Sequence, residues 1–159
     1  MLAKIKDFFK NLALKERSSH KLSLSLCVGI YIAFSPFPGF HTMMVFMLSW
    51  LMSLNFGIVL ASSIAVNNPW TMVPVYGAGH VFGRWLCVSA LGVGDMSTYN
   101  PTWVSSFNDW IAQYIGMPAV SLWAFIIGGN ILGIALALIF YPIFFWFFSN
   151  VHREEEKKI

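Results

Sequence analysis

A long stretch without charged side chains constrains this sequence more than any other feature. Residues 22–83 contain no Lys, Arg, Asp or Glu, and His41 and His80 are the only histidines among them. Charged residues make up 11% of the whole chain, whereas soluble domains carry roughly 25%. A soluble fold of this stretch would present no charged face to water, but the interior of a bilayer suits its composition. The sequence therefore predicts an all-α membrane protein, because helices satisfy their own backbone hydrogen bonds in lipid.

The basic residues lie mainly at the two ends of the chain. Lys and Arg occur before the first apolar segment and after the last one, and Arg84 is the single basic residue between them. Basic segments that flank apolar spans indicate the cytoplasmic side of a membrane, so both termini are predicted to be cytoplasmic. A nucleic-acid-binding surface would instead need Lys and Arg along one soluble face, and no nucleic-acid partner is expected.

The first half of the chain divides into a basic helix and a membrane core. Residues 1–20 alternate basic and apolar side chains with helical spacing. They are predicted to form a cytoplasmic amphipathic helix that lies in the membrane interface and is attracted to anionic lipid. The alternative is a helix that docks on the protein's own domain. Residues 21–91 are predicted to form the membrane core, with two Pro-containing breaks.

The second half divides into three further segments. Residues 92–110 contain acidic but no basic side chains, which predicts a polar loop outside the cytoplasm with Trp103 and Trp110 as interfacial anchors. Residues 111–148 are predicted to be a C-terminal transmembrane run, and residues 149–159 a charged cytoplasmic tail.

About four apolar spans are expected, and the first three are short. Segments 22–34, 41–54 and 56–66 would measure about 16–21 Å as helices, against a hydrocarbon core of about 30 Å. Two arrangements remain open before the outer loop: three crossings, or one crossing with two re-entrant helices. The final run is longer than a bilayer requires, which predicts a helix break or a close helix contact at its Gly-Gly-Asn sequence, residues 128–130.

The two breaks contain the candidate substrate-binding residues. The first break holds Pro36, Pro38, Gly39, His41 and Thr42, and the second holds Asn68, Pro69 and Thr71.

Backbone that leaves the helical pattern within a membrane must be sheltered by protein or line a cavity, so the two breaks are expected to face each other. Asn68 as N-cap and Pro69 at the first helical position predict one helix start, and a second is predicted near Gly39–Thr42. Two helix N-termini beside His41 would suit an anion such as a phosphate head group. The alternative is that both breaks are structural loops at the bilayer surface.

The same residues argue against catalysis. The charge-free region has no acid to complete a Ser/His/Asp set, and no paired carboxylates, CxxC motif or Gly-rich phosphate loop occurs. No enzyme activity, cofactor or metal is predicted.

A spaced pattern also runs through the membrane core: Gly29, the first break, Asn55, the motif Asn68-Pro69-x-Thr71-x-x-Pro74-x-Tyr76, and then Gly83. In this pattern the chain resembles a prokaryotic membrane family, domain of unknown function 2062. The likeness covers residues 21–91 and, more loosely, the final apolar run. The resemblance implies a multi-pass protein of the prokaryotic cytoplasmic membrane. Some relatives carry the domain fused to glycosyltransferase domains, which implies lipid-linked sugar or cell-envelope chemistry.

Two functions from different classes follow. The first is a small, homo-oligomeric transporter or flippase-like protein for an anionic or lipid-linked substrate, because Pro-interrupted short spans are typical of transporter sites. The alternative is a non-transporting membrane scaffold or accessory subunit of an envelope glycosyltransferase. Gly129 and Gly133 form a GxxxG pair that would suit helix packing in such a subunit.

Overall fold

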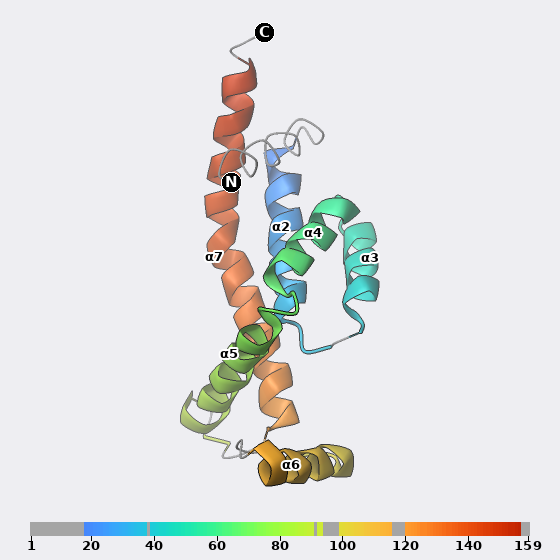
Figure 1. Cartoon of the computed structure of the whole chain (residues 1–159). Coiled ribbons are helices and arrows are strands. Elements are labelled where there is room, and N and C mark those ends of the chain that lie inside the picture. Colours follow the sequence, from blue (N-terminus) through green and yellow to red (C-terminus); the bar gives the residue numbers. More distant parts are fainter. Residues whose placement is uncertain (1–17, 38, 91, 94–98, 116–119, 157–159) are drawn as a thin grey trace. The chain divides into compact units, whose positions relative to one another are not determined.

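The computed structural model describes residues 18–37, 39–90, 92–93, 99–115 and 120–156 (Figure 1). All secondary-structure elements in these ranges are helical, which confirms the all-α prediction. They are α2 (Ser19–Phe34), α3 (His41–Leu51), α4 (Phe56–Val66), α5 (Met72–Trp85), the π-helix η1 (Leu86–Ala90), α6 (Thr102–Ile115) and α7 (Leu122–Glu156). The amphipathic helix predicted for residues 1–20 lies almost wholly outside the described residues.

The chain divides into two compact units. The first unit contains α2 up to Ala33, the helices α3 and α4, and α7 from Ile134 onward. The second unit consists of Phe34–Pro36 and Asn67–Gly133, which include α5, η1, α6 and the beginning of α7. The first break of the sequence therefore contributes residues to both units.

Among the described residues, the first unit has two buried apolar clusters. One joins α2, α3 and α4 and consists of Val28, Ile32, Val45 and Val59. The other joins α2, α4 and α7 and consists of Leu22, Leu26, Ile58 and Phe148. Helices α3 and α4 thus form an antiparallel hairpin that packs on α2 (Figure 1).

The backbones of α2 and α4 approach closely at Gly29. A Cβ atom at this position would overlap Ser62 Oγ and lie 2.6 Å from the carbonyl oxygen of Val59. Only glycine allows this contact, which explains why a Gly occurs here in a helix otherwise rich in larger apolar residues.

A tight turn connects α3 to α4. The Leu54 amide donates to the Ser49 carbonyl oxygen over 2.8 Å, and Ser53 has a φ of 52°. This pattern is a Schellman-type helix end, whose left-handed position usually holds glycine. Asn55 then caps α4, because its Oδ1 accepts a hydrogen bond from the Ile58 amide at 3.2 Å. The predicted boundary at Asn55 is confirmed.

Replacing Ser53 with glycine is expected to stabilise the protein. A left-handed conformation costs an L-residue about 1–2 kcal/mol, part of which the greater backbone entropy of glycine offsets. We expect a net gain of about 0.5–1 kcal/mol, seen as a rise of roughly 2–4 °C in the unfolding temperature in detergent. An unchanged or lower temperature would contradict the left-handed backbone at this residue.

In the second unit, α5 crosses the first part of α7 through small residues. Gly79 and Gly83 of α5 lie against Gly128 of α7. A Cβ atom built on Gly83 would lie 3.0 Å from the Cα atom of Gly128. The adjacent Gly129 faces the carbonyl oxygen of Phe34, at 2.6 Å from its own would-be Cβ. Small residues let helix backbones approach in this way.

Helix α7 is continuous through the Gly-Gly-Asn sequence where a break or a close contact was predicted. The structure shows a close helix contact at this sequence and no helix break. The Asn130 side chain donates to the Ile126 carbonyl oxygen of its own helix at 2.8 Å, so the amide stays within the helix. The segment Leu122–Arg153 is long and apolar enough to cross a membrane, and little of it is buried in the protein.

Two predicted boundaries in the second half of the chain differ from the structure. Residues 102–110 belong to helix α6 rather than to a polar loop, because Val104 and Asn108 place one buried side chain per turn on the same face. Residues 149–156 continue α7 rather than forming a separate tail. His152 in that extension is bonded to Ser19 Oγ through its Nδ1 atom at 2.6 Å, which ties the end of α7 to α2.

Candidate functional site

The first break turns the chain from α2 into α3. Helix α2 ends at Phe34, and the buried Pro36 cannot continue it because proline lacks an amide hydrogen. Gly39 has a φ of 90°, a conformation that side chains rarely adopt, and nothing lies within 4 Å of a Cβ built there. Glycine is therefore required at position 39 for its backbone and not for space.

Helix α3 begins at His41, as the sequence predicted for this region. Phe40 occupies the N-cap position and its side chain makes no capping hydrogen bond. His41 is half-buried and Thr42 is exposed. The positive end of the α3 dipole thus lies at His41 and Thr42 without a side-chain cap from the preceding residue. Pro38, also predicted to belong to this site, lies outside the described residues.

The second break forms a turn that satisfies its own amides. Asn68 Oδ1 accepts hydrogen bonds from the amides of Trp70 at 3.0 Å and Thr71 at 3.2 Å. Thr71 Oγ1 in turn accepts one from the Asn68 amide at 3.0 Å. Pro69 has no amide hydrogen, so this turn offers fewer free donors to an anion than the sequence suggested.

The capping role predicted for Asn68 is present, but the regular helix starts later than expected. Helix α5 begins at Met72, with Thr71 at its N-cap, whereas Pro69 was predicted as its first residue. Asn68 begins one additional turn before α5. In this turn the Met72 amide donates a hydrogen bond to the Asn68 carbonyl oxygen at 2.8 Å.

The predicted site residues are divided between the two units. Gly39, His41 and Thr42 belong to the first unit, and Pro36, Asn68, Pro69 and Thr71 belong to the second. Within the second unit the structure joins Asn68 to Thr71. That the two breaks face each other stays a prediction.

A polar cluster at the start of α7 was not predicted from the sequence. Asn108 of α6 bonds to both backbone groups of Val120, as acceptor at 3.0 Å and donor at 2.8 Å. Asn100 also donates to the Val120 carbonyl oxygen, at 2.9 Å, and accepts from the Leu122 amide at 2.9 Å. Both asparagines lie in segment 92–110, which was predicted to be a loop. The Asn100-Pro101 sequence is the local signal of a helix start that could have revealed α6.

His80 belongs to the same cluster. Its Nε2 atom accepts a hydrogen bond from the Ser121 amide at 3.1 Å, which places the ring proton on Nδ1. A histidine that holds a helix start in this way has a structural role.

Gly129 has a contact within its own chain. Its position against the Phe34 carbonyl oxygen means that this half of the GxxxG pair packs intramolecularly. The motif that motivated the accessory-subunit hypothesis therefore does not require a partner protein at Gly129.

The comparisons with known proteins extend the likeness seen in the sequence. A family model described as "Uncharacterized protein conserved in bacteria (DUF2062)" matches residues 2–157, and so includes the N-terminal segment and the α6 region. No curated protein and no solved structure matches the chain. Because the match covers nearly the whole sequence, this chain belongs to the bacterial DUF2062 family.

Proposed function

We propose that this protein is a multi-pass protein of the bacterial cytoplasmic membrane with both termini in the cytoplasm. The charge-free residues 22–83 and the length of α7 support the proposal. So does the exposed face of α3, where Met43, Met47 and Leu51 are each more than half exposed. Soluble monomers rarely expose an apolar surface of this kind, whereas lipid would cover it.

The dimensions of the α3–α4 hairpin favour a re-entrant arrangement. Each helix has 11 residues and therefore a length of about 16 Å, roughly half of the hydrocarbon core. A hairpin of this length enters and leaves on the same side of the membrane. With one crossing by α2 and one by α7, and α5 also re-entrant, α6 would lie outside and both termini inside. This is the second of the two arrangements that the sequence left open.

For the activity, we infer a small transporter or flippase-like protein, acting as a homo-oligomer on an anionic or lipid-linked substrate. The single observation that carries this inference is the start of α3. There the left-handed Gly39 brings the chain into a helix whose N-cap side chain makes no hydrogen bond, directly before His41. Backbone amides at such an end, together with an imidazole, can bind a phosphate or carboxylate group. The turn at Asn68, whose amides are bonded within the turn, would line the substrate pathway. The main hydrogen-bond donors to the substrate would come from the start of α3.

The test measures substrate movement in liposomes that contain the purified protein. One assay follows fluorescent phosphatidylglycerol from the inner to the outer leaflet, and the other follows uptake of radiolabelled inorganic phosphate. His41→Ala is expected to lower the active rate at least about tenfold, because a hydrogen bond to a charged group contributes roughly 1.5–3 kcal/mol. His41→Gln keeps a hydrogen-bonding side chain and is expected to lose less.

Asn68 provides a matched pair of variants. Asn68→Asp and Asn68→Ser both retain an acceptor for the turn amides, but only the aspartate adds a negative charge. If an anion passes this turn, Asp lowers the rate and Ser does not. Equal rates in all variants at unchanged protein levels would refute the site.

The accessory-subunit alternative has a different outcome. An envelope glycosyltransferase would then copurify in mild detergent, and neither phospholipid nor phosphate would move in liposomes with the protein alone. Under that outcome the His41 variants would leave the stability of the complex unchanged.

A further inference from the structure

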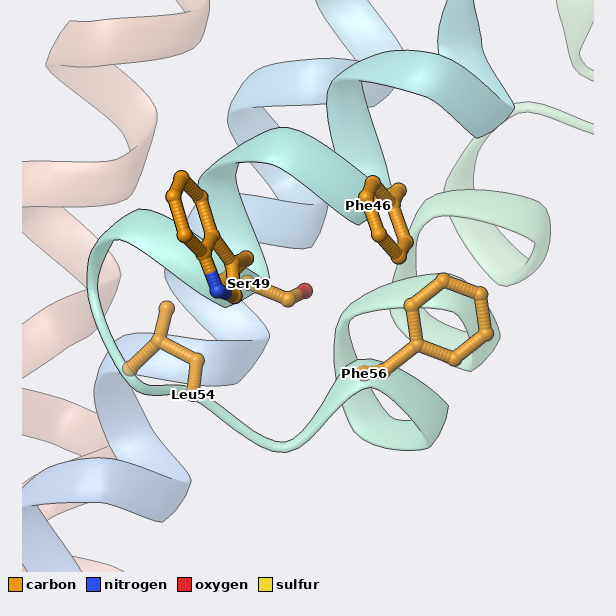
Figure 2. A pocket seen from close by; sticks show the side chains of 5 residues that line it. Phe46, Ser49, Leu54 and Phe56 are labelled. Atoms are coloured by element: carbon orange, nitrogen blue, oxygen red, sulfur yellow. The ribbon is translucent and has the colours of Figure 1, made fainter.

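An apolar groove lies between the two helices of the α3–α4 hairpin, wholly within the first unit. Its volume is about 450 Å³, and it is lined by Phe46, Ser49, Trp50, Leu54 and Phe56. Small-molecule sites typically measure about 300–1,000 Å³ and are mostly apolar with a few polar groups. Figure 2 shows the Ser49 hydroxyl directed into this groove, between the rings of Phe46 and Phe56.

The Ser49 hydroxyl has an unmet hydrogen bond. Ser49 is only 4% exposed, and among the described residues its Oγ is the one buried side-chain polar atom without a partner. Neighbouring buried serines behave differently. Ser23, Ser25 and Ser62 each donate to a carbonyl oxygen of their own helix, at 2.7, 2.7 and 3.0 Å. A buried donor without an acceptor is unfavourable, so the groove is complete only when an occupant supplies one.

The lining defines the chemistry of that occupant. No charged residue occurs between Lys21 and Arg84, and none of the five residues that line the groove is ionisable, so nothing in the groove can pair with a phosphate or an ammonium group. The walls are aromatic and aliphatic, and the polar side-chain groups of the lining residues, the Ser49 hydroxyl and the Trp50 indole N–H, can both donate. An occupant with a hydrocarbon chain and a neutral carbonyl acceptor satisfies both requirements.

We propose that this groove binds one acyl chain of a membrane glycerolipid, and that Ser49 Oγ donates a hydrogen bond to the ester carbonyl of that chain. The hydrocarbon then lies along Phe46 and Phe56, and the ester lies beside Ser49, one turn before the polar connection that contains Ser53 and Asn55. The proposal rests on the membrane location proposed above, and it is independent of transport.

A lipid fits this site better than a helix of another protein. The backbone carbonyl oxygens of a transmembrane helix already accept hydrogen bonds within that helix. The ester carbonyl of a lipid has no such internal partner and is free to accept. The half-exposed rings at the mouth of the groove, Phe46 at 62% and Phe56 at 42%, would also contact the surrounding acyl chains.

The experiment compares two lipids that differ only in the carbonyl. A phosphatidylglycerol with a photoreactive diazirine on one acyl chain is incorporated with the full-length protein into nanodiscs. After illumination, the labelled peptides are identified by mass spectrometry. Unlabelled ester-linked phosphatidylglycerol and its ether-linked analogue, which lacks the carbonyl, then compete for the labelling.

We expect labelling concentrated at residues 46–56, with the ester lipid competing about fivefold better than the ether lipid, as one hydrogen bond of ordinary strength would give. In Ser49→Ala the two lipids should compete equally. Ser53→Ala removes a nearby exposed hydroxyl that does not line the groove, and its ester preference should match that of the original protein.

Several results would overturn the proposal. The ester preference could be missing, or it could persist in Ser49→Ala. Labelling could be no stronger at the groove than at the exposed residues Leu138 and Trp146 of α7, as for ordinary surrounding lipid. Cross-links from the groove to a second copy of this chain would identify a protein occupant instead.

A loss of ester preference in Ser49→Ala would not be explained by misfolding of the variant. Ser49→Ala removes a hydroxyl that has no partner in the protein, so its unfolding temperature should be unchanged or higher. If the protein is recovered in the soluble fraction without detergent, the membrane location fails, and that failure is distinct from an empty groove in a membrane-inserted protein.

Discussion

Replacing Gly29 with alanine is expected to destabilise the protein by about 3 kcal/mol or more. The new methyl group would overlap Ser62 Oγ and press on the Val59 carbonyl oxygen, which lies 2.6 Å from its position. Overpacking of this kind typically costs about 1–3 kcal/mol, and more where rigid backbone must move. The apparent unfolding temperature in detergent, followed by tryptophan fluorescence, should fall by roughly 6–12 °C.

A second substitution separates the two obstacles at Gly29. Combining Gly29→Ala with Ser62→Gly removes the side-chain overlap but leaves the Val59 carbonyl oxygen in place. Less than half of the lost stability should therefore return. Gly57→Ala, in the first turn of α4, serves as the control. A Cβ atom there would make only an ordinary contact with the Asn55 side chain, at 3.4 Å. If Gly29→Ala behaves like Gly57→Ala, α2 and α4 do not approach as described.

Gly83→Ala is expected to have the second large effect, in the other unit. A methyl group there would overlap the Ala124 carbonyl oxygen and lie 3.0 Å from the Cα atom of Gly128. Both obstacles are backbone atoms of α7, so no change of side-chain rotamer can relieve them. We expect a loss of about 3 kcal/mol or more and failure of α5 to pack on α7.

The control for this contact is Gly77→Ala on the same helix. Nothing lies within 4 Å of a Cβ at position 77, and alanine favours a helix by about 1 kcal/mol over glycine. Gly77→Ala should therefore be neutral or stabilising while Gly83→Ala lowers the unfolding temperature and the yield of monodisperse protein. Comparable stability of the two variants would rule out the described crossing of α5 and α7.

These contacts change how the two candidate functions compare. The sequence offered Gly129 as a surface for a partner, but the structure places the Phe34 carbonyl oxygen against it. It also offered the amides of the Asn68 turn to an anion, but Asn68 and Thr71 bond them internally. The start of α3 at His41 therefore carries more of the proposed substrate site than the second break does.

The sequence by itself determined the features that depend on local chemistry. Proline at position 36 ends α2, glycine at 39 allows a positive φ, and Asn55 and Asn68 cap the turns they begin. Each of these effects acts within a few residues, so the local sequence determines it without a contact from a second segment. The absence of charge between Lys21 and Arg84 likewise predicted helices, and the secondary-structure elements of the described residues are all helical.

Only the tertiary structure decided what depends on a second segment. The Gly-Gly-Asn sequence could equally end a helix or admit a neighbour, and the approach of Gly79, Gly83 and the Phe34 carbonyl made it a contact. Asn108 became a buried partner of Val120 because α6 packs at the start of α7. Ser49 resembles the other helix serines in sequence, and its unmet hydroxyl appears only when α3 and α4 enclose a groove. Such properties arise from which surfaces meet, and the pattern of a single segment does not contain that information.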